Sequence, residues 1–162
     1  MIRQAMFNED RTKRFWLYRS WGCPNEPCIT FIGLNPSTAD EREDDPTIRR
    51  CIGFAKRHEY GHMYMINLFS TVSPKPTDID NSNEAIVQNF VRWGVPLKLS
   101  DAIVYAWGSF SAAKAIEKTV VPMFPEALCL GKNQDGSPKH PLYLPNKTRL
   151  VPFNRELTDD QV

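Results

Sequence analysis

Three polar side chains follow or interrupt apolar runs of the sequence, and each is of a type that can bind or polarise a ligand. Asn35 stands in the stretch GLNPST, residues 33–38, directly after the apolar run 28–32. Asn67 lies inside a second apolar run, where a buried amide needs partners for its hydrogen-bonding groups. His140 stands in a Pro-bracketed loop and carries a ring that titrates near neutral pH. Two amides and an imidazole can recognise a ligand by hydrogen bonding and stabilise charge that develops on it.

Each of these side chains also has a purely structural interpretation. Asparagine before proline is a common turn former, because the amide bonds the local backbone and Pro36 fixes the next φ angle. A histidine such as His140 is often a structural hydrogen bonder. The elements that carry these residues must therefore be considered before a role is assigned.

Alternating apolar runs and amphipathic segments predict an α/β fold. Asp45 and Pro46 form the expected start of a helix, as N-cap and first helical residue. Strands alternating with helices predict a three-layer α/β/α sandwich with a central, mostly parallel, four-stranded sheet. We expect one domain over residues 1–162. The predicted strands are residues 28–33, 63–69, 102–107 and 127–130, the helices begin near 46, 82 and 109, and 15–19 is an edge strand or hairpin arm.

The carboxyl ends of parallel strands are where open α/β sheets bind ligands. We expect strand 28–33 to lie next to strand 102–107, with strands 63–69 and 127–130 outside them. This order brings the polar segments that follow each strand to one edge of the sheet. The two long irregular connections, residues 70–81 and 131–148, have the length of functional loops.

Composition limits the class of protein and its partners. Of the 162 residues, 41% are hydrophobic and 24% are charged, which is typical of a globular chain. The net charge of +1 argues against a coat of nucleic acid and still permits a local basic groove. No apolar stretch approaches the roughly 20 residues that span a bilayer. We therefore expect a soluble, cytoplasmic protein without a membrane partner. The sequence does not define the oligomeric state, and we favour a monomer.

Two groups of residues suggest a metal site, and each has a simpler explanation. The cysteines Cys23, Cys28, Cys51 and Cys129 lack the two close pairs of a structural site, so we expect no metal or iron–sulfur cluster. The acidic run 40–45 is expected to be a solvated loop that leads into a helix N-terminus. Its alternative is a Mg²⁺ site.

Several motifs carry a resemblance that covers nearly the whole chain. The stretches LNPSTAD, DDPTIRRC, NLFS, AWG and CLGKNQDGSPKHPLYLP resemble a bacterial and phage family known only as domain of unknown function 1643. The order of Gly-x-Asn-Pro after a strand, a strand-end Asn, and a late His-Pro is also similar to the uracil-DNA glycosylase superfamily. That likeness implies a uracil-DNA glycosylase-like fold and a nucleic-acid or nucleotide partner.

The superfamily resemblance assigns roles to individual residues. It implies that Asn35 orients the attacking water, that Asn67 reads the pyrimidine edge, and that His140 donates a hydrogen bond to the base carbonyl. Asn35 and His140 are thus the candidate catalytic residues. Candidate substrate contacts are Gly33, Leu34, Pro36, Ser37, Thr38, Asn67, Phe69, Trp107, Gly108, Ser109 and Pro141, and candidate phosphate contacts are Arg49, Arg50, Lys132 and Lys139. Phe69 or Trp107 could provide the face on which a base stacks, although the apolar core is the favoured place for both rings.

The chain departs from the superfamily pattern in two places. Leu142 and Tyr143 follow the last His-Pro, where glycosylases usually have Ser. No cysteine occurs near residues 70–81, where the cluster-binding branches have one, so we expect no cofactor. Two other functions remain open: a module of the same fold that binds a nucleotide, nucleobase or DNA without cleaving it, and a Mg²⁺-dependent phosphoryl-transfer enzyme using Asp40, Asp44 and Asp45.

Overall fold

The computed structural model describes residues 1–154. The strands are β1 (Ile2–Phe7), β2 (Arg14–Ser20), β3 (Cys28–Gly33), β4 (His62–Asn67), β5 (Ala102–Tyr105), β6 (Leu128–Cys129) and β7 (Val151–Pro152). The helices are α1 (Pro46–Arg57), α2 (Asn83–Val91), α3 (Gly94–Leu99) and α4 (Ala113–Val120), with short 3₁₀ turns η1 (Pro76–Asp78) and η2 (Val121–Met123). Within this part of the chain, no helix has the length and apolar character that crossing a membrane requires.

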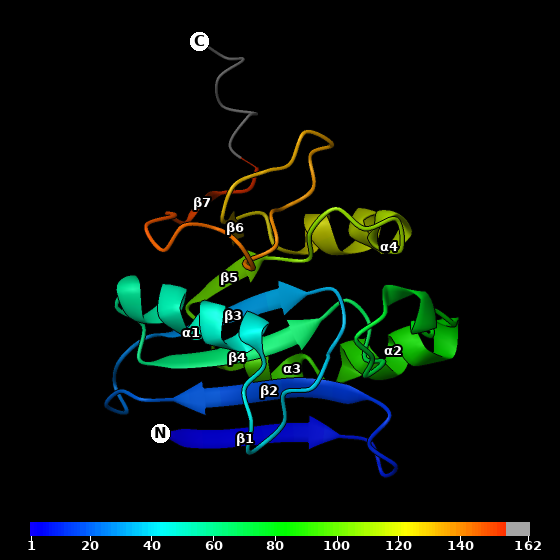
Figure 1. The fold of residues 1–162 in the computed structure, drawn as a ribbon, viewed down its shortest axis with the longest axis horizontal. Coiled ribbons are helices and arrows are strands. Elements are labelled where there is room, and N and C mark those ends of the chain that lie inside the picture. The colour runs from blue at the N-terminus through cyan, green and yellow to red at the C-terminus, as the bar shows by residue number, and fades with distance from the viewer. Residues whose placement is uncertain (155–162) are drawn as a thin grey trace.

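All of these strands form one mixed sheet in the order β1-β2-β4-β3-β5-β6-β7. The four middle strands β4, β3, β5 and β6 are mutually parallel and have the order that the sequence predicts. The expectation of a four-stranded sheet is wrong, because seven strands pair within the described residues. Strands β1 and β2 add an antiparallel hairpin at one edge and β7 pairs antiparallel at the other (Figure 1).

Helices flank this sheet and enclose two separate apolar clusters. Side chains alternate along each strand, so neighbouring residues enter opposite clusters. Phe31 packs with the buried face of α1, whereas Ile32 packs with α4 and with Trp93, which precedes α3. In Figure 1, α1 lies across the front of the central strands. The chain therefore has helices over both faces of one mixed α/β sheet.

Local signals fix the helix that matters most for the site. Asp45 caps α1, with its Oδ1 accepting the backbone N–H of Ile48 at 2.8 Å, and proline stands at the first helical position. The predicted single helix from residue 82 is instead two, because Gly94 begins α3 and does not end α2. Pro96 fits there because the first turn of a helix needs no intrahelical N–H donor.

Candidate functional site

A cavity of about 650 Å³ lies at the carboxyl ends of the parallel strands β3 and β4. Asn35, Asn67 and His140, which are far apart in the sequence, all line it. This agrees with the convergence that the topology predicts. The remaining lining residues are Arg14, Gly33, Leu34, Pro36, Ser37, Asp45, Thr47, Ile48, Met65, Ser73, Pro74, Pro76, Gly108, Ser109, Phe110, Asn133, Lys139, Leu142, Tyr143 and Leu144.

The two ends of the Asn35 side-chain amide have different surroundings. Its Nδ2 donates to the backbone carbonyls of Thr71 at 2.9 Å, Ser73 at 3.0 Å and Pro36 at 3.2 Å. These contacts tie the loop after β3 to the loop after β4, and they fix the orientation of the amide, because only the NH₂ group can donate. Within residues 1–154 no donor reaches Oδ1. The amide oxygen is therefore the atom that Asn35 can offer to a water or ligand.

Asn67 is 3% exposed and is held by a buried arginine. Arg14 donates through Nη2 to Oδ1 of Asn67 at 3.2 Å and through Nη1 to the carbonyl of Ala39 at 3.0 Å. Asn89 braces the same strand end by donating to the Asn67 carbonyl at 2.8 Å. Because Oδ1 accepts from Arg14, the Nδ2 group is the free part of the amide, and no acceptor for it occurs within residues 1–154. Asn67 thus presents N–H donors to the cavity.

Gly33 gives the Asn67 amide its space. The two residues are partners in the parallel register of β3 and β4. A Cβ atom at position 33 would lie 2.8 Å from Asn67 Nδ2 and 2.6 Å from Met65 Cε. Contacts this short do not occur between unstrained atoms, so a glycine is required while the amide keeps its present orientation.

Arg14 is a buried cation at the cavity and was not among the residues expected from the sequence. It is 2% exposed, its Nε–H is buried without an acceptor, and no carboxylate within residues 1–154 forms an ion pair with it. Burial lowers the pKa of Arg14 to about 10, against the opposing effect of the nearby Asp45, so the guanidinium stays cationic at neutral pH. A buried charge without a paired anion favours a ligand that is, or becomes, negative.

His140 has a defined tautomer. Its Nδ1 accepts the backbone N–H of Leu142 at 3.1 Å, so in the neutral ring the proton is on Nε2. Burial lowers the pKa of His140, although the Asp45 carboxylate acts in the opposite direction. Within residues 1–154 no acceptor reaches Nε2. His140 is thus suited to donate one hydrogen bond as a neutral imidazole.

Asp45 combines its capping role with a place in the cavity wall. It is 7% exposed, and only Oδ1 is used by the cap. Its neighbours in the acidic run are committed elsewhere: Asp40 Oδ1 accepts the N–H groups of Arg42 and Glu43, and Asp44 pairs with the buried Arg19 at 2.8 Å. These carboxylates do not converge, and residues 1–154 contain no cluster of three His, Cys, Asp or Glu that could hold a metal. The Mg²⁺ alternative therefore gains no supporting geometry.

Some expected substrate contacts line the cavity and others do not. Gly33, Leu34, Pro36, Ser37, Gly108 and Ser109 do so together with Asn67. Phe69 and Trp107 are 3% and 0% exposed in the apolar core, and neither lines the cavity. The expectation that one of them stacks on a ligand is corrected accordingly. Thr38 and Pro141 are also absent from the cavity wall.

The aromatic residues that do reach the cavity are Phe110 and Tyr143. Phe110 is 37% exposed, and its ring lies against Gly108. Tyr143 is 93% exposed and adopts a φ of 71°, a conformation that non-glycine residues rarely take. Both stand just after a polar strand-end or His-Pro segment, which is the signal that could have identified them. Arg14 had no such signal, because an arginine at the start of a strand is usually exposed.

The four expected phosphate contacts separate into three places. Lys139 lines the cavity. Arg49 and Arg50 line a different hollow, on the outer side of α1. Lys132 extends over the ring of Phe153, with its Nζ 4.4 Å from the ring centroid. Only Lys139 can therefore contact a ligand held in the cavity itself.

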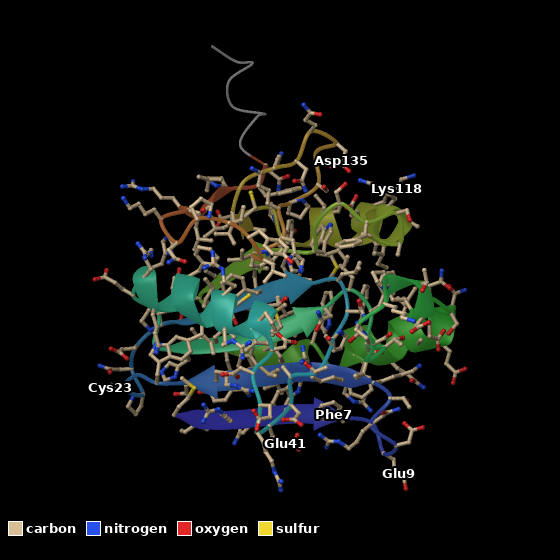
Figure 2. The ribbon with its side chains drawn as sticks, viewed as in Figure 1. Phe7, Glu9, Cys23, Glu41, Lys118 and Asp135 are labelled. Atoms are coloured by element: carbon tan, nitrogen blue, oxygen red, sulfur yellow. The ribbon has the colours of Figure 1, made fainter. Side chains whose placement is uncertain are left out.

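The loop that carries His140 is held by contacts of Asp135 with two residues that follow β5, Ser109 and Lys114. Asp135, labelled in Figure 2, accepts hydrogen bonds from Ser109 at 2.5 Å and from Ser137, and it forms an ion pair with Lys114 at 2.9 Å. These contacts hold the pKa of Asp135 well below its usual range. The Ser109 hydroxyl donates its hydrogen to Asp135, so Ser109 positions this loop as well as lining the cavity.

The cysteines are dispersed as reduced thiols. Cys23 is exposed, whereas Cys28, Cys51 and Cys129 are buried. Burial raises the pKa of Cys28 to about 11 and raises that of Cys51 as well. Buried thiols of raised pKa are poor nucleophiles and poor metal ligands, because both roles need the thiolate.

Comparison with known proteins adds a family and no activity. A family model described as "Protein of unknown function (DUF1643)" matches residues 14–142. No curated protein and no solved structure matches the chain. The matched range begins at Arg14 and ends at Leu142, so it includes all the cavity residues apart from Tyr143 and Leu144.

Proposed function

We propose that this chain, which belongs to the DUF1643 family of proteins of unknown function, recognises a uracil-like base in its cavity. The reaction we assign to it is hydrolysis of the N-glycosidic bond of such a base when it is flipped out of a nucleic acid. One observation carries the proposal. Asn35, Asn67 and His140 line one cavity, and their hydrogen-bonding atoms that lack a protein partner match those the reaction needs.

Recognition rests on two donors. Asn67 offers Nδ2–H and His140 offers Nε2–H, and uracil has two carbonyl acceptors on either side of its N3 position. Cytosine has an amino group in place of one carbonyl, so it would set a donor against a donor. A site built from fixed donors rejects such a ligand because buried polar groups are left unpaired.

The chemistry needs water and a stabilised leaving group. Water attacks the anomeric carbon of the sugar, the C–N bond breaks, and its electron pair leaves with the base. The Asn35 amide oxygen holds the water, and the proton that the water loses ends on the departing base or in solvent. A neutral His140 donates to the base oxygen most strongly as negative charge develops there, which lowers the barrier.

Two fixed charges at the cavity support the same pathway. The sugar acquires oxocarbenium character as the bond breaks. Asp45 is a carboxylate in the cavity wall and would favour that positive charge. Arg14 is a buried cation behind Asn67 and would favour the negative charge on the base. Negative charge near the sugar and positive charge near the base are what such a transition state requires.

The proposal is tested by incubating the protein with oligonucleotides that contain uracil, mismatched thymine or modified pyrimidines. Released base is measured directly, and abasic sites are converted to strand breaks by alkali. We expect release from at least one uracil-like substrate and none from the cytosine-containing control. Binding of these oligonucleotides without any base release would contradict hydrolysis.

A second function, binding without cleavage, is favoured by one specific contact. The Asn35 amide is already engaged by three backbone carbonyls, and an amide cannot act as a general base. If bracing is the whole role of Asn35, the cavity reads a base and leaves the bond intact. The release assay separates the two functions, because base release needs the water position at Asn35, whereas binding without release leaves bracing of the two loops as the whole role of that side chain.

A further inference from the structure

A second hollow of about 260 Å³ lies on the outer side of α1. Three arginines of that helix, Arg49, Arg50 and Arg57, surround it, with Gly53 between them. A Cβ at Gly53 would meet nothing within 4 Å, so the space above Gly53 is open. Phe54 and Asn146 complete the wall, and none of these described lining residues is acidic.

Two of the arginines in this hollow, which we call the arginine groove, are held by hydrogen bonds, and none of the three pairs with a carboxylate within residues 1–154. Arg49 donates to the backbone carbonyl of Asp44 at 2.9 Å. Arg50 donates to the Leu144 carbonyl and to Asn146 Oδ1, and its Nε–H is buried without an acceptor. No salt bridge within residues 1–154 involves any of the three. Three uncompensated guanidiniums around one hollow provide the planar donors that bind phosphate oxygens.

The arginine groove is adjacent to the base cavity. Leu142, Tyr143 and Leu144 line the cavity, whereas Asn146, two residues further on, lines the groove. Arg50 contacts this segment from the groove side through Leu144 and Asn146. Two residues span at most about 7 Å, so the hollows are separated by little more than the thickness of one chain segment. The exposed Tyr143 ring stands beside the opening of the cavity.

We infer that the arginine groove is a backbone phosphate site, and that the ligand of this protein is therefore a polynucleotide and not a free base or mononucleotide. This inference rests on the proposed base recognition. A strand with one base in the cavity passes over the segment 142–146, where an aromatic ring can stack on a neighbouring base. Its next phosphates reach the arginines. A basic groove beside an exposed aromatic residue is the usual design for holding single-stranded nucleic acid.

The test compares a double variant with a matched control. Arg49→Gln with Arg57→Gln removes two groove charges and keeps Arg50, which supports the loop. Lys98→Gln with Lys118→Gln removes the same charge from exposed lysines on α3 and α4, which pack on the other face of the sheet (Lys118 is labelled in Figure 2). The probes are a short single-stranded oligodeoxyuridylate, uridine monophosphate and free uracil, titrated at several salt concentrations.

We expect the groove variant to bind the oligonucleotide about ten-fold more weakly, with the slope of log affinity against log salt reduced by about 0.7 per phosphate lost. Uracil binding should be unchanged, which also reports an intact cavity. The control should keep both properties.

Three results would overturn the inference. Equal losses in both variants would mean unspecific charge, and no loss in either would mean that no phosphate is held there. A loss for uridine monophosphate as large as for the oligonucleotide would assign the groove to a mononucleotide. If wild-type protein binds the oligonucleotide through the groove but no free uracil, the base proposal fails and the phosphate site stands.

Discussion

Arg14 donates through Nη2 to Oδ1 of Asn67 at 3.2 Å, and this contact decides which end of the amide faces the cavity. A guanidinium has no acceptor, so the Asn67 oxygen must be the atom that it holds. The same arginine is anchored at its other end by the Ala39 carbonyl. The base preference that we propose for Asn67 thus depends on a residue that need not touch the base itself.

The Arg14→Lys variant tests this dependence. Lysine keeps the positive charge but cannot reproduce the fork that reaches Ala39 and Asn67 together. The amide is then free to rotate and to present its oxygen to an amino group. We expect the preference for uracil over cytosine to fall by about ten-fold, because that is roughly the contribution of one buried hydrogen bond to affinity. Competition binding with the two bases measures this preference. If Arg14 acts only through its charge, lysine will preserve the preference.

Replacement of Gly33 by alanine should remove base recognition with little loss of structure. The added methyl group would collide with Asn67 Nδ2 and with Met65 Cε. The methionine tip can move, whereas the amide is held by Arg14. We expect weakened uracil binding and a free energy of unfolding lowered by about 1–3 kcal/mol, measured by urea titration.

Gly53→Ala is the matched control for that variant. Gly53 is exposed on α1, and a Cβ there meets nothing within 4 Å. Alanine in a helix interior is favoured over glycine by about 0.5–1 kcal/mol, so this variant should be slightly more stable and should bind uracil normally. Equal effects of both alanines on uracil affinity would show that crowding at position 33 is not the cause.

Asp45→Asn separates the charge of Asp45 from its cap. Asparagine caps helices about as well as aspartate, so the unfolding free energy should change by less than about 0.5 kcal/mol. If the carboxylate stabilises positive charge on the sugar, base release should slow by on the order of a hundred-fold. Asp45→Ala should lose the cap as well, at about 1 kcal/mol. Full activity in Asp45→Asn would exclude this electrostatic role.

The pH profile follows from the neutral state of His140. Burial holds its pKa below the ordinary 6.5, with the Asp45 carboxylate opposing that shift. The unfolded chain therefore binds this proton more readily, and His140 makes folding less favourable as pH falls below 6.5. Base release should be constant near neutral pH and decline as His140 becomes protonated at lower pH. Release that rises on acidification, with the fold monitored by circular dichroism, would assign the role to the imidazolium.

Much of the fold and of the candidate site could be predicted from local patterns in the sequence. Asp45 followed by proline marks the start of α1, because both residues have strong positional preferences. The alternation of strands and helices gave the order of the four parallel strands, and topology then brought Asn35, Asn67 and His140 to one edge. These features depend on short-range signals and on the handedness of crossovers.

Other features depend on contacts between distant segments. The strand β1 is largely exposed and lacks apolar alternation, so only its pairing with β2 identifies it. Arg14 is likewise placed by distant segments, because its guanidinium contacts Ala39 and Asn67, which are 25 and 53 residues away in the sequence. Which aromatic residue reaches the cavity also depends on the exact strand end: β5 stops at Tyr105, Trp107 stays in the core, and Phe110 emerges. No local pattern contains this information.

The most direct test of base hydrolysis is single-turnover release of uracil from an oligonucleotide, with wild-type or His140→Ala protein in saturating excess over it. His58→Ala is the control, because His58 bonds Phe54 and Leu150 and does not line the cavity. We predict that His140→Ala slows release by about 10²–10³-fold while oligonucleotide affinity changes little, since the Nε2 hydrogen bond strengthens mainly in the transition state. His58→Ala should release uracil at the wild-type rate. No release by the wild type, with oligonucleotide affinity lost in His140→Ala, would contradict hydrolysis and leave a base-binding module.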